Sequence, residues 1–182
     1  MKEVVRLAAP IQKDSIVDGE GLRTVIWFQG CPHNCPGCHN PSSHDLKGGT
    51  ITKISDIIKF IDDLKHQDGI TFSGGEPMHQ PEALLQIAKH AKEKKLNTWS
   101  FTGYTFEELL IMSEKNPIYL EILNNIDVLV DGTFKIKEKS LNLKFRGSKN
   151  QRIIDVKKSL KNNKCVLIQK YRKEKKVVVS LY

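Results

Sequence analysis

The chain lacks the long apolar segments and the leader pattern that direct proteins to membranes. Among its 182 residues, no run approaches the ~18 consecutive apolar residues of a membrane-spanning helix. The first residues do not join a basic region to an apolar stretch, as a secretory signal does. A chain with 39% hydrophobic and 27% charged residues suits one compact globular domain. We therefore expect a cytoplasmic protein with no membrane contact.

The sequence also lacks the residue groupings that usually carry acid–base or nucleophilic catalysis. No His/Ser constellation and no paired-carboxylate constellation of a catalytic kind is recognisable. The histidines at positions 44, 66, 79 and 90 show no pairing pattern. We therefore expect no amino-acid side chain to act as a catalytic acid, base or nucleophile.

Cysteine is scarce, and three of the four cysteines lie close together. Cys31, Cys35 and Cys38 form a C-x3-C-x2-C array within Gly30–Asn40, whereas Cys165 lies far downstream with no motif around it. Three thiolates on a short loop can bind one face of an iron–sulfur cube, and complete protein ligation of a [4Fe–4S] cluster needs four cysteines. The array therefore predicts a cluster with one iron open to another ligand, as in catalytic metal centres.

Two other interpretations of the array stay open at this point. A disulfide is disfavoured, because three close thiols would compete for it and nothing marks the chain as secreted. Zinc is a stronger rival, since His33 and His39 lie in the same loop and Cys3His zinc sites exist. A structural zinc site usually adds a second pair of ligands further along the chain, and no such pair appears. The spacing therefore favours iron–sulfur over zinc.

A Gly-Gly-Glu turn follows the cysteine array at the end of an apolar segment. In Ser73–Pro77, Gly74 and Gly75 let the backbone approach a ligand closely, and Glu76 offers an acceptor for an ammonium group. Together with the cysteine array, this turn resembles the radical S-adenosylmethionine (SAM) superfamily. The resemblance implies that the open iron chelates the amino and carboxylate groups of SAM. It also implies that one electron from the cluster cleaves the sulfonium and releases a 5′-deoxyadenosyl radical.

Apolar runs and helical periodicities alternate along the first 130 residues or so. Four strands are expected, at Leu22–Gln29, Ile70–Phe72, Asn97–Thr102 and Ile126–Val130. Three helices are expected, at Thr52–Lys65 (capped by Thr52 or Ser55), at Pro81–Lys95, and from Thr105 with Glu108 in a capping box. This alternation predicts an α/β fold with a parallel sheet. An eight-fold barrel needs at least ~200 residues, so a partial (β/α) barrel is expected.

The C-terminal part differs in pattern and in charge. Residues 133–182 have a net charge of +13, against −5 for residues 1–132. We expect residues 1–156 to form the core and residues 157–182 a basic, β-rich extension of the same domain, with Val166–Gln169 and Val177–Leu181 as a possible hairpin. The extension has little aromatic interleaving and no nucleic-acid motif, so no nucleic-acid partner is expected. It is either a solvated lysine-rich face or a docking surface for an acidic protein.

A stretch after the fourth expected strand makes the resemblance specific to one family within the superfamily. Ile126–Phe134 is followed by Leu143–Asp155, which contains Arg-Gly-Ser-Lys-Asn-Gln-Arg at positions 146–152. From about residue 10 to residue 156, the chain resembles the anaerobic ribonucleoside-triphosphate reductase-activating proteins. These are small radical SAM activases that install a glycyl radical on a class III ribonucleotide reductase. The resemblance implies a partial barrel of the radical SAM type, the large glycyl-radical subunit of that reductase as partner, and flavodoxin or a similar electron donor.

The resemblance also assigns roles to residues. Cys31, Cys35 and Cys38 would ligate the cluster; the backbone of Gly37, Cys38 and His39 would bind the adenine of SAM; and Gly74, Gly75 and Glu76 would bind its methionine moiety. Family members commonly have proline where this chain has Glu20 and Thr133. The change at Glu20 falls in a turn and should matter little, whereas Thr133 leaves the loop near the site less firmly placed.

Other residues have two possible roles. Asp131 either faces SAM or caps the next loop. Arg146 and Arg152 either clamp a carboxylate or the partner's glycyl loop, or form surface salt bridges. His33 and His39 either tune the cluster through hydrogen bonds or are exposed loop histidines, which are commoner. Cys165 is expected to be a small buried apolar residue.

Three alternative functions stay open. The first is activation of another glycyl-radical enzyme, such as pyruvate formate-lyase, and the second is a small-molecule radical SAM synthase like the deazaguanine carbon-ring synthases. The stretch at residues 146–152 argues against both. The third is a zinc-stabilised nucleic-acid-binding module that uses the basic C-terminal part.

Overall fold

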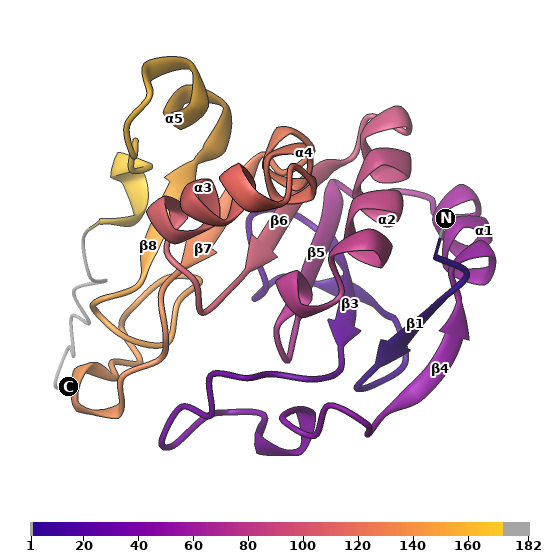
Figure 1. Ribbon diagram of the computed structural model, residues 1–182, viewed down its shortest axis with the longest axis horizontal. Coiled ribbons are helices and arrows are strands. Elements are labelled where there is room, and N and C mark those ends of the chain that lie inside the picture. Colours follow the sequence, from indigo (N-terminus) through magenta and orange to yellow (C-terminus); the bar gives the residue numbers. More distant parts are fainter. Residues whose placement is uncertain (1, 173–182) are drawn as a thin grey trace, which may run out of the picture.

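The computed structural model describes residues 2–172, which form a mixed α/β fold around one eight-stranded sheet (Figure 1). Four central strands run parallel: β3 (Arg23–Phe28), β5 (Gly69–Gly74), β6 (Asn97–Phe101) and β7 (Val128–Asp131). Antiparallel strands extend both sides of this centre: β1 (Val4–Leu7), β2 (Gln12–Ser15), β4 (Thr50–Lys53) and β8 (Arg152–Asp155). The sheet order is β4-β1-β3-β5-β6-β7-β8, with β2 also paired to β3. The expected parallel sheet is confirmed in its centre.

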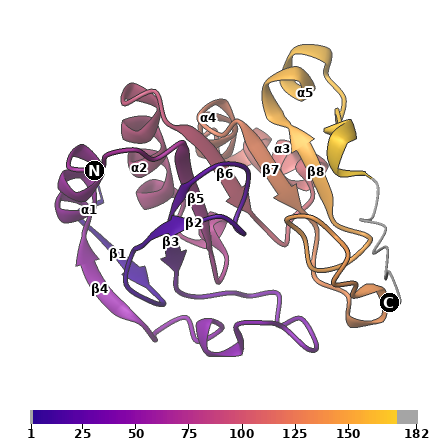
Figure 2. The same cartoon turned by 180° about the vertical axis from the view of Figure 1, so that it is seen from behind.

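The helices of the described residues lie on one face of this sheet, in front of it in Figure 1 and behind it in Figure 2. They are α1 (Ile54–Asp62), α2 (Pro81–Glu93), α3 (Phe106–Lys115), α4 (Ile118–Asn124) and α5 (Val156–Asn162). The main core fills the space between helices and sheet, with fully buried side chains from both, among them Ile26, Phe72, Leu129, Ile57, Leu84 and Leu109. None of the helices in residues 2–172 is both long enough and apolar enough to cross a membrane.

A second, smaller core covers the opposite face of the sheet at its β6–β8 side. Because side chains alternate along a strand, Trp99 points to this face, where it packs with Val130, Ile153 and Tyr171. Beneath Trp99 lies the fully buried guanidinium of Arg23, 5.4 Å from the ring centroid. Its nitrogens donate to Glu20, Ile70, Thr71 and Asn97. Burial lowers the pKa of Arg23 to about 10. This hydrogen-bonded cation links the amino-terminal ends of β3, β5 and β6.

Most of the strands and helices expected from the sequence are present, with shifted ends. Pro81 occupies the first turn of α2, and the capping box of Thr105 and Glu108 is formed, so both predictions are confirmed. The first helix begins at Ile54 rather than Thr52, because Thr52 pairs with Val5 in the strand β4. The expected caps are therefore wrong: the N-cap position is Lys53, and no side chain caps this helix.

The C-terminal extension differs from the expected β-rich segment within the described residues. Residues 156–162 form the helix α5, and the N–H of Lys158 in its first turn donates to the N-cap side chain of Asp155. Val166–Gln169 is not a strand: Leu167 makes one isolated bridge to Ile154, and a 3₁₀ turn, η4 (Gln169–Tyr171), follows. The turn places Tyr171 in the second core, where its hydroxyl donates to Glu20. The second expected arm, Val177–Leu181, lies outside the described residues.

Candidate functional site

A cleft of about 470 Å³ lies at the carboxyl ends of the parallel strands, the edge at which α/β sheets bind their ligands. Its walls come from the cysteine loop (residues 30–40), the Gly-Gly-Glu turn, the end of β6 and the loop between β7 and β8. Figure 1 shows the cysteine loop and the β7–β8 loop on the same side of the sheet, below it in that view. The lining includes the side chains or backbone of Cys31, His33, Cys35, Cys38, His39, Gly74, Gly75, Glu76 and Arg146.

The cysteine loop is tightly wrapped, and its three cysteines lie partly exposed on the cleft wall. Asn34 and Gly37 both adopt positive φ angles, 50° and 72°, which turn the chain sharply between successive cysteines. The backbone N–H of Asn40 donates to Sγ of Cys38 at 3.4 Å. Burial raises the pKa of the Cys31 thiol, against the lowering effect of nearby backbone N–H groups. Metal loading at this thiol would therefore release a proton.

The two glycines of the turn hold the end of β5 against the chain that enters the cysteine loop. A Cβ atom on Gly74 would lie 2.5 Å from the carbonyl oxygen of Phe28, and one on Gly75 would lie 2.5 Å from that of Gly30. The backbone N–H of Glu76 donates to the same oxygen of Gly30 at 2.8 Å. Glycine is therefore required here by the approach of two backbone segments. It also leaves the cleft floor free of side chains beside the cysteines.

Glu76 lies at the bottom of the cleft and is fully buried. Its Oε1 accepts from the N–H of Met78 at 2.9 Å, and its Oε2 accepts from the N–H of Gly103 at 2.8 Å. The same Oε2 lies 2.8 Å from Nε2 of His33, whose ring packs edge-on against Tyr104. A carboxylate offers about four lone-pair directions, so these contacts leave capacity for one further donor. The contact between His33 and Glu76 was not foreseen from the sequence, which left His33 either as a residue that tunes the cluster or as an exposed loop histidine.

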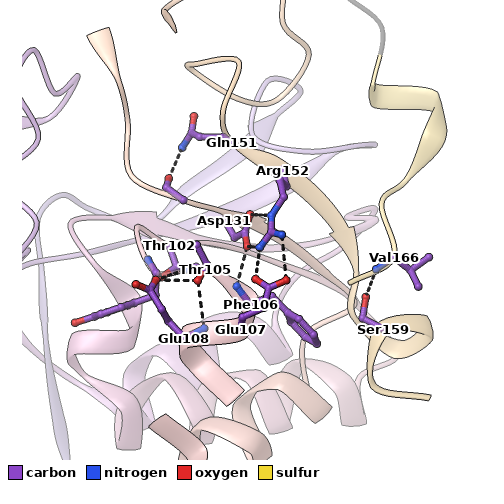
Figure 3. A network of polar contacts seen from close by, with 12 residues as sticks. Thr102, Thr105, Phe106, Glu107, Glu108, Asp131, Gln151, Arg152, Ser159 and Val166 are labelled. Atoms are coloured by element: carbon purple, nitrogen blue, oxygen red, sulfur yellow. Dashed lines mark hydrogen bonds and ion pairs between the residues drawn. The ribbon is translucent and has the colours of Figure 1, made fainter. Parts of the chain in front are cut away.

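Asp131 is placed differently from its expected position facing SAM. Its carboxylate is buried and accepts from the N–H of Phe106 at 2.8 Å, at the start of α3, and from Arg152 at 2.5 Å (Figure 3). Arg152 also pairs with Glu107, and both carboxylates raise its pKa. Within the described residues, neither Asp131 nor Arg152 belongs to the cleft lining. Asp131 therefore caps the start of α3, a contact that neither of its two expected roles (facing SAM or capping the next loop) described, and Arg152 forms the salt bridge that was one of its expected roles.

The stretch around Asn150 and Gln151 fixes the loop that closes one side of the cleft. Gln151 accepts from the N–H groups of Gly147 and Ser148 and donates to the carbonyl oxygen of Gly132. Asn150 donates to the carbonyl oxygen of Thr133 at 2.8 Å. These amides compensate for the absence of a proline at position 133, so the loop is firmly placed.

The cleft lining includes residues that the sequence analysis did not assign to the site, among them His44 and Phe134. His44 lies just beyond the cysteine loop, and its buried Nε2 has no hydrogen-bond partner within residues 2–172. Phe134 packs on His39 with ring centroids 4.9 Å apart. The only sequence signal for His44 is its nearness to the cysteine array, which does not reveal which way the side chain points. Cys165 lies away from the cleft and packs against the main core.

Three cysteine thiols on one wall of the cleft are a donor set of the kind that ligates an iron–sulfur cube. A cube spreads its thiolate ligands over separate corners. The three thiols share the cleft with a glycine-lined floor and with the buried nitrogen of His44, and the cleft volume is in the range of small-molecule pockets.

Comparison with known proteins agrees with this geometry. The family model described as "4Fe-4S single cluster domain" matches residues 17–154. An anaerobic ribonucleoside-triphosphate reductase-activating protein of Salmonella typhi is 38% identical over 144 residues, covering 75% of this chain and 90% of the relative. The protein of that name from Escherichia coli K12 is 35% identical over 145 residues, with the same coverage of both chains. A pyruvate formate-lyase-activating enzyme of Clostridium pasteurianum is 39% identical over 109 residues, covering 55% of this chain and 46% of the relative.

Proposed function

The chain belongs to the family of the anaerobic ribonucleoside-triphosphate reductase-activating proteins, and from that premise we propose that it is a radical SAM glycyl-radical activase. The observation that carries the proposal is that Cys31, Cys35 and Cys38 share one cleft with Gly74–Glu76 at the carboxyl ends of the parallel strands. The open sheet then corresponds to a partial (β/α) barrel of the radical SAM type. Residues 1–156 are the proposed core of this domain, and residues 157–172 are the described part of its C-terminal extension.

In this proposal the three cysteines hold a [4Fe–4S] cluster, and the backbone of Gly37–His39 binds the adenine of SAM. Gly74 and Gly75 leave room for the methionine moiety, and the remaining lone pair of Glu76 accepts its ammonium group. When bound, the cluster and SAM supply one-electron cleavage of the sulfonium and hydrogen-atom abstraction from a glycine of the partner.

The chain's own residues position these groups and exclude water. His33 and Gly103 hold the carboxylate of Glu76 in one orientation, so that it does not have to reorganise when an ammonium arrives. Apolar side chains form one wall of the cleft: Phe101, Phe134, Leu143 and Phe145. Such a wall limits the access of water to a reactive carbon centre.

We further propose that the partner is an anaerobic ribonucleoside-triphosphate reductase and that flavodoxin or a similar protein donates the electron. Support for this choice comes from relatives of that name that match this chain over 90% of their length. The pyruvate formate-lyase-activating relative matches over 46% of its length. Activation of pyruvate formate-lyase is therefore the second candidate.

The test is anaerobic reconstitution with iron and sulfide, followed by reduction with dithionite in the presence of SAM. The expected products are methionine and 5′-deoxyadenosine, with a glycyl-radical signal in electron paramagnetic resonance when the reductase is added. Cys31→Ser, Cys35→Ser and Cys38→Ser should each abolish cleavage, whereas the matched control Cys165→Ser should keep it. A glycyl-radical signal with pyruvate formate-lyase alone would reassign the partner, and bound zinc without sulfide would overturn the proposal.

A further inference from the structure

The loop between β7 and β8 carries concentrated positive charge at the mouth of the cleft. Residues 132–151 contain one acidic residue, Glu138, and six basic residues, for a net charge of +5: Lys135, Lys137, Lys139, Lys144, Arg146 and Lys149. All five lysines are exposed. Part of the positive charge of the C-terminal sequence therefore lies beside the functional site, in the β7–β8 loop.

Exposed aliphatic side chains accompany this charge. In the loop, Leu141 is 92% exposed and Ile136 is 54% exposed. Between β2 and β3, Ile16 and Val17 are each 71% exposed, and Val17 lines the cleft. These exposed aliphatic groups are available for apolar contact with a protein bound beside the cleft.

The β7–β8 loop packs directly against the cysteine loop. A Cβ atom on Gly37 would lie 2.5 Å from Cδ1 of Ile136, and one on Gly147 would lie 3.2 Å from Cε1 of His39. A molecule bound to residues 132–151 would therefore stand over the cleft, next to the cysteines.

The loop is also held in one shape. The N–H of Lys149 donates to the carbonyl oxygen of Glu138 at 2.9 Å, and Lys139 pairs with Ser148 in an isolated bridge. Gln151 fastens its base. Because the backbone is already ordered, binding a partner here requires little loss of loop entropy.

We propose that the β7–β8 loop is the docking surface for an acidic polypeptide segment of the protein whose glycine enters the cleft. This inference rests on the proposed function and names the surface chemistry of its partner. Lysines with interspersed aliphatic groups attract an acidic, partly apolar protein surface and speed its encounter. Nucleic acid fits less well, because the aromatic residues of the loop point inward. Phe134 packs on His39, and Phe145 packs on Trp99 and Tyr171, so neither offers an exposed ring for stacking on bases.

The experiment compares the wild-type chain with two charge-reversal variants. Lys137→Glu with Lys139→Glu alters the loop, and Lys157→Glu with Lys161→Glu is the matched control on exposed lysines of α5. Binding to the large subunit of the anaerobic reductase is measured anaerobically by biolayer interferometry at low and high salt. The loop variant should bind about 10-fold more weakly at low salt, mainly through slower association, and the difference should shrink at high salt. The control should change affinity less than about 2-fold.

Equal affinity of the loop variant and the wild type would overturn the proposal, as would an equal loss in the control. Dithionite-driven SAM cleavage without reductase separates this outcome from failure of the proposed function. If the wild type cleaves SAM but the loop variant binds the reductase as tightly as the wild type does, only the docking surface is refuted. If the wild type does not cleave SAM but the loop variant binds the reductase more weakly, only the activase chemistry is refuted. A fluorescent single-stranded oligonucleotide is the third probe: if the loop variant loses oligonucleotide binding but keeps reductase binding, the surface belongs to nucleic acid.

Discussion

The imidazole of His33 and the carboxylate of Glu76 meet at 2.8 Å, although 43 positions separate them in the chain. His33 belongs to the cysteine loop, and Glu76 to the turn that would hold SAM. The same carboxylate oxygen accepts from the N–H of Gly103, in a third loop. One buried carboxylate therefore fixes the relative positions of the two loops that our proposal assigns to the cluster and to the nucleotide.

Replacing His33 with alanine should weaken SAM binding more than it weakens folding. Glu76 keeps two backbone donors in this variant, so the fold loses about 1.5–3 kcal/mol, the usual contribution of one hydrogen bond to a charged group. The cysteine loop, however, loses its side-chain contact with the Gly-Gly-Glu turn and keeps only the backbone hydrogen bond between Glu76 and Gly30. We expect SAM affinity of the reconstituted protein to fall about 10-fold, measured by equilibrium dialysis. His39→Ala, which loses only the ring contact with Phe134, is the control; equal losses in both variants would contradict a specific role of His33.

Gly75→Ala should prevent cluster assembly. Its Cβ would lie 2.5 Å from the carbonyl oxygen of Gly30, a backbone atom that cannot move without displacing Cys31. We expect a loss of roughly 1–3 kcal/mol in unfolding free energy and iron content near zero after reconstitution. Gly147→Ala is the comparison, because its Cβ would meet ring atoms at 3.1 Å and 3.2 Å, which can shift slightly. Normal iron content in Gly75→Ala would show that the close approach is not needed.

The sequence predicted the centre of the fold because the central strands and their helices have clear periodicity. The strands β3, β5, β6 and β7 are apolar runs, and α2 combines an apolar face with a proline at its start. Their partners at the sheet margins were missed. The strands β1 and β4 have four residues each, and β4 has no buried residue, so its pattern is that of a loop. Only pairing with β1 makes it a strand.

In the site too, local motifs could be identified from the sequence, whereas contacts between distant residues could not. The cysteine loop and the Gly-Gly-Glu turn are local motifs, so their residues were identified before their positions were known. The roles of Asp131, Arg152 and Gln151 depend on contacts across 19 to 45 positions. Spacing along the chain cannot distinguish a carboxylate that faces a ligand from one that caps a helix.

The hydrogen bond between Tyr171 and Glu20 should make part of the unfolding free energy depend on pH in the acid range. Hydrogen bonds from Lys170 and then Tyr171 lower the pKa of Glu20 below its ordinary value of 4.5. A carboxylate with a depressed folded-state pKa contributes stability above its unfolded pKa and loses it as the pH falls through the folded pKa. Unfolding free energy should therefore fall below pH 4.5, and Glu20→Gln should make this fall shallower. Chemical denaturation between pH 3 and pH 6 measures the effect, which is small because Glu20 is 56% exposed. Parallel curves for both proteins would contradict it.

His44→Leu should separate ligand binding from folding. In residues 2–172 the buried Nε2 of His44 has no hydrogen-bond partner, and a buried polar atom without a partner costs about 1–3 kcal/mol. Replacing the ring with an apolar side chain removes that cost, so the metal-free variant should melt at the same temperature as the wild type or higher. If Nε2 of His44 forms a hydrogen bond with the bound cluster or nucleotide, the variant should also bind SAM about 5- to 30-fold more weakly. This is the loss expected for one hydrogen bond of about 1–2 kcal/mol. Unchanged affinity with a raised melting temperature would show that His44 has no ligand to contact. Loss of both properties would show that its ring is needed for packing.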